Sequence, residues 1–191
     1  MTVTNPKIRR IINLCLLIPI TLFCSVLLFV NQPALAGIND DRYDGNVYVV
    51  YAGNGSLVPP RSTLAQSLEK EKPAVLIFYM DDSSDCKQFA IIVSRIQEFY
   101  GRAANLIPIA IDSISSKSDW SPTEAGYYYE DAVPQTVIID QKGEVAYNGK
   151  GQVKYEEIDD ALREVLDLLP RTESAELKRR SFNEFNSGLA N

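Results

Sequence analysis

The sequence predicts an α/β fold in which a mixed central β-sheet lies between two layers of helices, a three-layer sandwich. Two observations predict it. Strand-like apolar segments alternate with helix-like segments between residues 47 and 112, and an antiparallel pair of strands followed by a last helix fits residues 136–169. Strand–helix alternation that runs into an antiparallel pair produces a mixed sheet with helices on both faces.

The first three elements come from local composition. Residues 47–52 (VYVVYA) are rich in β-branched and aromatic residues, which indicates a strand. Residues 63–71 place Leu64 and Leu68 on one side of a short helix. Residues 74–80 (AVLIFYM) form a continuous apolar run, which is typical of a central strand buried on both faces.

The middle of the chain predicts one long helix and a further strand. Apolar residues recur at helical spacing over residues 85–100, and Gly101 ends this helix. Residues 106–112 form the next strand. Residues 113–132 are a polar connection that carries Trp120 and the run 127–129 of three tyrosines.

A hairpin and a helix complete the predicted domain. Residues 136–140 and 144–148 form two strands around the turn at residues 141–143. Residues 155–169 form the last helix, which Pro170 ends. We therefore expect a domain over residues 37–170 and a charged tail over residues 171–191.

Residues 1–36 resemble an export signal. Three basic residues precede a nearly continuous apolar stretch over residues 11–30, and Ala34-Leu35-Ala36 supplies the small-x-small pattern that a signal peptidase accepts. The stretch also approaches the ~20 residues that span a bilayer. We expect cleavage after Ala36, with retention as an N-terminal membrane anchor as the alternative. In both cases the rest of the chain is expected to lie on the far side of the membrane from the cytoplasm.

Composition excludes several classes of function. The 191-residue chain has no histidine, which removes Ser-His and Cys-His nucleophile pairs and imidazole metal sites. Without Lys7, Arg9 and Arg10, 16 basic residues remain against 25 acidic ones, a charge of −9. Because phosphate binding needs a basic face, we expect no nucleic-acid partner. We also expect no cofactor and no metal.

Three segments resemble thioredoxins when taken in order. Phe78-Tyr79 ends the apolar strand, residues 83–87 (SSDCK) open the long helix where the family has its C-x-x-C motif, and Val133-Pro134 resembles the family's loop with a cis proline. The resemblance covers residues 47–169 and implies a thioredoxin-like fold. It also implies that Pro134 is cis and shapes a groove beside Cys86.

The departures from thioredoxins are more informative about chemistry. The position of the attacking cysteine holds Ser83, and only the resolving position is kept, as Cys86. Dithiol exchange needs a thiolate that attacks and a second thiol that resolves the mixed disulfide, and a serine hydroxyl does not ionise near neutral pH. The buried acid of thioredoxins would fall near Ile77. We therefore predict no enzymatic activity and no catalytic residue.

Each residue near this motif also has a structural interpretation. Cys86 fits a small buried hydrophobe, with a regulatory or mixed-disulfide thiol as the alternative. Ser83 or Ser84 fits the N-cap of the helix. Three nearby carboxylates oppose a thiolate while the helix N-terminus favours one, which leaves the direction of the Cys86 pKa open. These carboxylates are Asp81, Asp82 and Asp85. We expect them to complement the helix dipole rather than to bind a cation.

Longer strings point to a narrower family. Residues 39–46 (NDDRYDGN), 51–60 (YAGNGSLVPP), 81–87 (DDSSDCK) and 178–186 (KRRSFNEFN) are similar to the cyanobacterial thylakoid membrane photosystem I accumulation factors. The resemblance implies a protein at the thylakoid membrane, with its globular domain on the lumen side. It would support assembly or accumulation of photosystem I by binding photosystem subunits or assembly intermediates. The candidate binding groove is formed by Ser83, Cys86, Val133 and Pro134, and the alternative is a single-thiol redox protein acting through Cys86.

Overall fold

The computed structural model describes residues 18–19, 37–117 and 119–174. The chain divides into two compact units, Met1–Ala36 and Gly37–Asn191. Almost all of the predicted export segment and residues 175–191 of the predicted tail lie outside the described residues. Within the described part of the chain, no helix combines the length and the apolar character needed to cross a bilayer.

A four-stranded mixed sheet forms the middle of the domain. Its order is β2-β1-β3-β4. β1 runs parallel to β2, whereas β3 is antiparallel to both β1 and β4. The mixed sheet predicted from the sequence is therefore confirmed, and its strands are β1 (Ala74–Tyr79), β2 (Asn105–Ala110), β3 (Gln135–Ile139) and β4 (Val145–Lys150).

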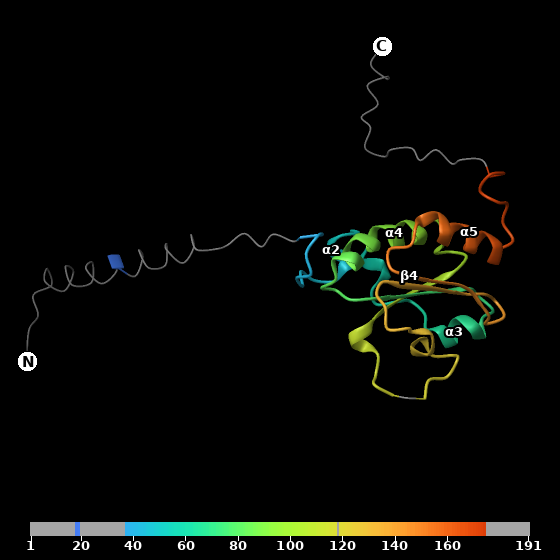
Figure 1. The fold of residues 1–191 in the computed structure, drawn as a ribbon, viewed down its shortest axis with the longest axis horizontal. Coiled ribbons are helices and arrows are strands. Elements are labelled where there is room, and N and C mark those ends of the chain that lie inside the picture. Colours follow the sequence, from blue (N-terminus) through green and yellow to red (C-terminus); the bar gives the residue numbers. More distant parts are fainter. Residues whose placement is uncertain (1–17, 20–36, 118, 175–191) are drawn as a thin grey trace, which may run out of the picture. The chain divides into compact units, whose positions relative to one another are not determined.

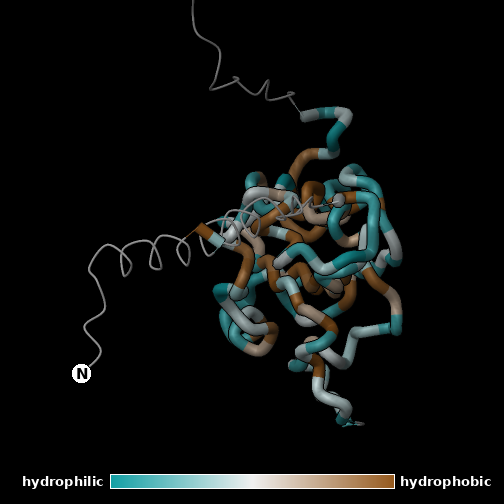
Figure 2. The backbone as a smooth tube through the Cα atoms, turned by 90° about the vertical axis from the view of Figure 1, so that its left-hand side faces the viewer, coloured by the Kyte–Doolittle hydropathy of each residue, from teal (hydrophilic) through white to brown (hydrophobic). Residues whose placement is uncertain are grey.

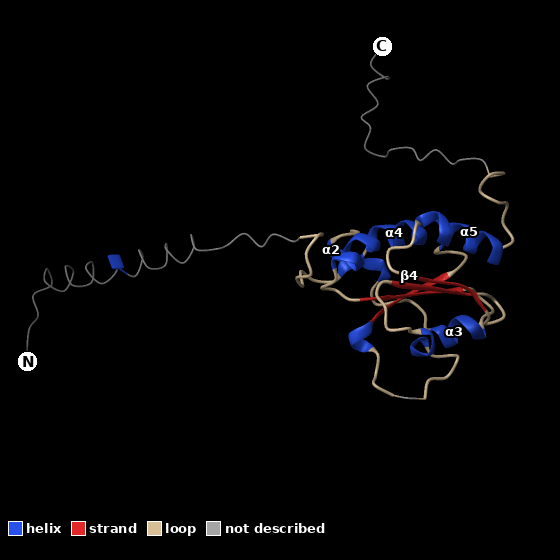
Figure 3. Cartoon of the chain, in the orientation of Figure 1, coloured by secondary structure: helices blue, strands red, loops and turns tan. Residues whose placement is uncertain are grey.

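Helices cover both faces of this sheet. Three of them lie on one face, namely α2 (Val47–Val50), α4 (Ser84–Tyr100) and α5 (Tyr155–Val165), and α3 (Leu64–Glu69) lies on the other (Figures 1 and 3). Thr63 and Gln66 form a capping box that begins α3, since each side chain bonds the other residue's backbone N–H. The three-layer arrangement follows from β1, whose six residues are all buried and so need cover on both faces.

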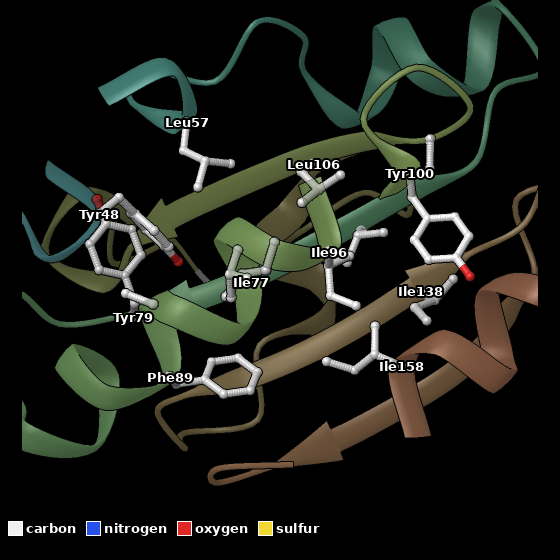
Figure 4. Packing of buried hydrophobic residues seen from close by; sticks show 14 of the residues in the cluster. Tyr48, Leu57, Ile77, Tyr79, Phe89, Ile96, Tyr100, Leu106, Ile138 and Ile158 are labelled. Carbon is white, nitrogen blue, oxygen red and sulfur yellow. The ribbon is translucent and has the colours of Figure 1, made fainter. Parts of the chain in front are cut away.

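The hydrophobic core is divided in two by the sheet. Alternate residues of β1 point to opposite faces, so Val75, Ile77 and Tyr79 join the cluster under α4 and α5, and Leu76 and Phe78 join the cluster on the α3 side. Figure 2 shows the hydrophobic segments gathered inside the domain and the hydrophilic ones around it. In Figure 4 the rings of Tyr48 and Tyr79 lie together at one end of the larger cluster, and their centroids are 5.0 Å apart.

The prediction of a strand over residues 47–52 is wrong. Residues Val47–Val50 form α2, because Asn46 caps a helix there by accepting a hydrogen bond from the backbone N–H of Tyr48. Asp81 also accepts the N–H of Val47 at 2.9 Å. These contacts outweigh the β propensity of the segment, which depends on a neighbouring strand being present. The four residues of α2 differ in burial: Val47 and Tyr48 are buried, and Val49 and Val50 are exposed.

Other boundaries differ less from the prediction. α5 ends at Val165 rather than residue 169, because Asp167 takes a left-handed backbone with φ of 52°. The polar connection after β2 contains two short 3-10 helices, Ile111–Ser113 and Ala125–Tyr128. The remaining predicted strands and helices are present within a few residues of their expected bounds.

A buried carboxylate fastens α5 to α4 and to the chain that follows α5. The Tyr100 hydroxyl donates to Asp159 Oδ1 at 2.5 Å, and Arg163 Nε donates to Asp159 Oδ2 at 2.8 Å. Arg171 forms an ion pair with Asp160 and lies 3.7 Å from Asp159 Oδ2. Asp159 is only 3% exposed, and these partners supply the hydrogen bonds that a buried charge requires.

The two-sided core generates a stability prediction. We expect Ile138→Ala to lower the free energy of unfolding by about 2–5 kcal/mol, because it leaves a cavity where Ile138 is fully buried on β3. Ile91→Ala is the matched control, since Ile91 is 50% exposed on α4, and its effect should stay within about 0.5 kcal/mol. Urea unfolding of both variants measures this, and equal losses would contradict the assigned burial.

Candidate functional site

Ser83 begins the helix that carries Cys86. The Ser83 hydroxyl accepts a hydrogen bond from the backbone N–H of Cys86 at 3.3 Å, so the predicted N-cap is confirmed and belongs to Ser83 rather than Ser84. The backbone N–H of Ser84 donates instead to Asp41 Oδ1 at 2.8 Å. Two of the free N–H groups of the first turn of α4 are thus bound by oxygens of the same chain.

Cys86 is enclosed in the core. Its side chain belongs to the larger apolar cluster, the residue is 2% exposed, and its sulfur accepts the backbone N–H of Met80 at 3.5 Å. Burial is the main cause that raises the pKa of the Cys86 thiol, and the charges of Asp85 and Asp81 add to it. The hydrogen bonds from Met80 and to Ser83 act in the opposite direction but are weaker. The sequence left open the direction in which the pKa of Cys86 shifts, and the structure raises it, which favours the neutral thiol.

The Val133–Pro134 peptide bond is cis, as the resemblance to thioredoxins implied. Pro134 is buried, and Val133 is partly buried against the apolar cluster that contains Cys86. On the other side of the sheet, the ring of Tyr129 lies 5.2 Å from that of Phe78. The structure thus brings the Val133–Pro134 turn to the end of β1 from which Cys86 follows along the chain.

Ile77 stands where thioredoxins have a buried acid. It is 1% exposed, and its β-sheet partners are Pro108 on β2 and Thr136 on β3. The Thr136 hydroxyl has no hydrogen-bond partner among the described residues. Neither Ile77 nor its two partners in the register carries a proton that it could exchange with a thiol near neutral pH.

The three carboxylates near Cys86 have different surroundings. Asp81 accepts hydrogen bonds from Asn46 and Val47, although burial still raises the pKa of its carboxyl. Asp85 accepts the side-chain amide of Gln152 at 2.7 Å, and Asp82 is exposed. Within the described segments, no group of three or more acidic or thiol side chains is placed to hold a metal ion.

The tyrosine run is only partly exposed. Tyr127 is 54% exposed, and its ring packs edge-on against Tyr128 at 5.0 Å between centroids. The Tyr128 hydroxyl donates to the backbone carbonyl of Pro122 at 2.9 Å. Tyr127 is therefore the aromatic side chain of this run that a partner could contact.

Sequence reasoning missed the most highly connected side chain of this region, Lys87. Its side chain has 0% exposure although it follows Cys86 on a surface helix. Five oxygens lie 2.6–3.1 Å from its Nζ: the carbonyls of Gly37, Asp40 and Arg42 and the carboxylates of Asp40 and Asp44. We call residues 37–44, which supply all five, the N-terminal strap. In the sequence, the one feature that pointed to this strap was its three aspartates, Asp40, Asp41 and Asp44.

The electrostatics of the strap favour the charged forms. Burial disfavours the Lys87 ammonium, but hydrogen bonds to Asp44 and Asp40 more than offset this and raise the pKa of Lys87. The hydrogen bond from Tyr51, followed by that from Lys87, holds the pKa of Asp44 well below its usual range. Lys87 therefore remains an ammonium, and Asp44 remains a carboxylate, throughout the neutral range.

Comparison with known proteins assigns the family. The thioredoxin-like domain family matches residues 60–166. The chain belongs to the thioredoxin-like family. It is also similar to "Thylakoid membrane protein slr1796" of Synechocystis sp., with 57% identity over 156 residues, which cover 82% of this chain and 78% of that protein.

Two solved structures are more distant. One, described as the structure of a malarial protein, is 15% identical, covers 50% of this chain and 98% of its own, and has a TM-score of 0.40. The other is thioredoxin-2, a component of the malaria parasite protein secretion machinery. It is 15% identical, covers 49% of this chain and 82% of its own, and has a TM-score of 0.41.

This thioredoxin-like site supplies one buried thiol and one capping hydroxyl. Attack on a disulfide needs an accessible thiolate, and release of the product needs a second thiol. Cys86 is buried, and burial favours its protonated form. Ser83 uses its hydroxyl to begin α4. In the described structure the thiol is therefore enclosed and the hydroxyl is bound to the backbone.

The strap of this thioredoxin-like domain generates a second prediction. Lys87→Met keeps most of the side-chain volume but leaves three carbonyls without their ammonium donor and removes one of the two cations that face Asp40 and Asp44. Removing one partner from a buried charge cluster is strongly destabilising, so we expect a marked fall in the urea midpoint and earlier proteolysis within residues 37–44. The measurement is urea unfolding with limited proteolysis.

Lys150→Met is the matched control for this variant. Lys150 pairs with Glu130 at 2.6 Å, but both side chains are about half exposed, at 50% and 48%. An exposed ion pair contributes up to about 1 kcal/mol, so this variant should remain close to the wild type. A Lys87 variant that unfolds at the same urea concentration as the control would contradict the importance of the strap.

Proposed function

We propose that this protein is a non-catalytic thioredoxin-like factor that supports assembly or accumulation of photosystem I at the thylakoid membrane. The observation that carries the proposal is the state of the motif at the start of α4. Ser83 caps the helix in place of an attacking cysteine, and Cys86 is 2% exposed. The scaffold of a thiol enzyme is retained while both groups that would exchange a disulfide are engaged in the fold.

The cellular place rests on similarity. The relative with 57% identity is named as a thylakoid membrane protein, and 82% of this chain aligns with it. The strings quoted from the sequence, the last of which lies in the tail, resemble the photosystem I accumulation factors. The predicted export segment supports placing the globular domain on the lumen side, because a chain that follows such a segment crosses the membrane.

The proposed binding surface surrounds the former thiol motif. It is the set expected from the resemblance, in which Ser83 and Val133 are partly exposed while Cys86 and Pro134 are buried, and we add to it the exposed Tyr127 of the connection before β3. Aromatic side chains that combine an apolar ring with a polar hydroxyl are enriched among the anchors of protein interfaces. A photosystem I subunit or assembly intermediate is the partner that we propose for this surface.

Deletion and affinity purification test the function. In a cyanobacterium that lacks the gene, we expect the photosystem I content per chlorophyll to fall while photosystem II remains. A tagged chain should copurify photosystem I subunits from thylakoids, and Tyr127→Ala should weaken this copurification by several fold. Lys142→Ala, at an exposed turn residue, is the matched control. An unchanged photosystem I level in the deletion strain would refute the proposal.

A single-thiol redox role is the second candidate, because Cys86 is the free thiol of the described domain. Our proposal predicts that Cys86 in the folded protein reacts with iodoacetamide at least tenfold more slowly than in urea, owing to its burial and raised pKa. It further predicts that the purified protein does not reduce insulin disulfides. A Cys86→Ser strain with normal photosystem I content would exclude the redox role, whereas loss of function in a stably folded Cys86→Ser protein would favour it.

A further inference from the structure

The N-terminal strap begins at a residue whose chemistry would change if the chain were cleaved after Ala36. The backbone N–H of Gly37 donates to Asp44 Oδ2 at 3.2 Å, and the Gly37 carbonyl accepts from Lys87 Nζ at 3.0 Å. Both polar atoms of the Gly37 backbone are therefore held by the folded domain. The compact unit of the domain also begins at this residue.

The Asp40 side chain lies against the backbone of Gly37. A Cβ built on Gly37 would lie 2.0 Å from Asp40 Oδ2, which is far inside any real contact distance. The carboxylate of Asp40 thus lies directly beside the Gly37 backbone, in addition to the hydrogen bond that Asp44 accepts from it. The carboxylates of Asp40 and Asp44 thus both lie beside Gly37, which would be the first residue of a processed chain.

The acidic side chains of the strap outnumber the basic side chains that face them. The strap contributes three carboxylates, and among the described residues the cations that the structure places against them are Arg42 and Lys87. Arg42 lies 3.3 Å from Asp44 Oδ1 and 3.6 Å from Asp40 Oδ2. From α2, the C-cap residue Tyr51 donates its hydroxyl to Asp44 Oδ2 at 2.5 Å. One further positive charge would balance the three carboxylates, which are Asp40, Asp41 and Asp44.

We propose that the strap is a receptor for the processed N-terminus, in which the α-ammonium of Gly37, released by cleavage after Ala36, pairs with Asp44 and Asp40. The cleavage is a hydrolysis by a signal peptidase: water breaks the amide bond, its oxygen forms the Ala36 carboxylate, and the Gly37 nitrogen becomes an ammonium. The small-x-small run Ala34-Leu35-Ala36 is the sequence that this class of peptidase accepts.

The capture has a consequence for the amine itself. An ammonium within about 4–6 Å of a carboxylate keeps its proton to higher pH than a free amine, because the opposite charge favours the charged form. Only the neutral amine reacts with acylating reagents. The captured amine should therefore react slowly near neutrality and normally at alkaline pH, where the α-amine has lost its proton.

The first test is the mass of the native protein. Mass spectrometry of the chain isolated from thylakoids is expected to give residues 37–191 with an unblocked N-terminal glycine. Alkaline carbonate, which strips proteins that lack a membrane span, is expected to release it. A chain that still begins before Gly37 would overturn the proposal, and so would a different processed N-terminus. Neither result depends on a role in photosystem I, so failure here is separate from failure of the proposed function.

The second test measures the capture on the processed chain. The matched control has one alanine inserted between Ala36 and Gly37, which leaves the small-x-small pattern intact and moves the new amine by one residue. At pH 7 we expect the Gly37 amine to be acylated about tenfold more slowly than the control amine, which corresponds to one unit of pKa. The two rates should converge above pH 10.

The shape of the pH profile separates capture from simple shielding. Steric shielding would slow the Gly37 amine equally at all pH values, whereas an ion pair slows it only below the pH at which the ammonium loses its proton. Rates for the two chains that are equal at pH 7, or a difference that persists unchanged above pH 10, would overturn the capture. Far-ultraviolet circular dichroism of both chains confirms that they share one fold.

Discussion

The ammonium of Lys87 is the charge around which the start of this domain is organised. Residues 37–44 contain no helix or strand, and their backbone carbonyls turn toward one side chain of α4. A buried ammonium without such partners would cost several kcal/mol, and a cluster of aspartates without a cation would repel itself. The strap and the lysine therefore require each other, and α4 is the element that brings them together.

This arrangement also encloses the start of α4, where Cys86 lies. The strap passes over the first turn of α4, where Asp41 accepts the N–H of Ser84 and Ser83 caps the N–H of Cys86. A helix N-terminus is a natural place for an anion, and in this protein an internal carboxylate already occupies it. Ser83 and the strap thus both bind backbone N–H groups in the first turn of α4.

The fold could be predicted to a large extent, and the reasons for the failures are physical. The apolar run of β1 and the helical spacing in α4 are local signals, and both elements are present with nearly the expected bounds. The segment around Val47 also has strong local β propensity, yet Asp81, distant in sequence, binds its backbone and no strand pairs with it. At the site, the capping role of Ser83 was readable from its position, whereas the burial of Lys87 was not, because it depends on a loop fifty residues earlier in the chain.

The carboxylate of Asp159 has a practical consequence for work with this protein. Through Arg163 and Arg171 it binds the backbone that leaves α5, and Arg163 also donates to the Ser174 hydroxyl at 2.7 Å. The backbone at Ser174 is therefore held beside α5 by these side chains. A fluorophore attached at position 174 would report on the packing of α5 rather than on a loosely held segment.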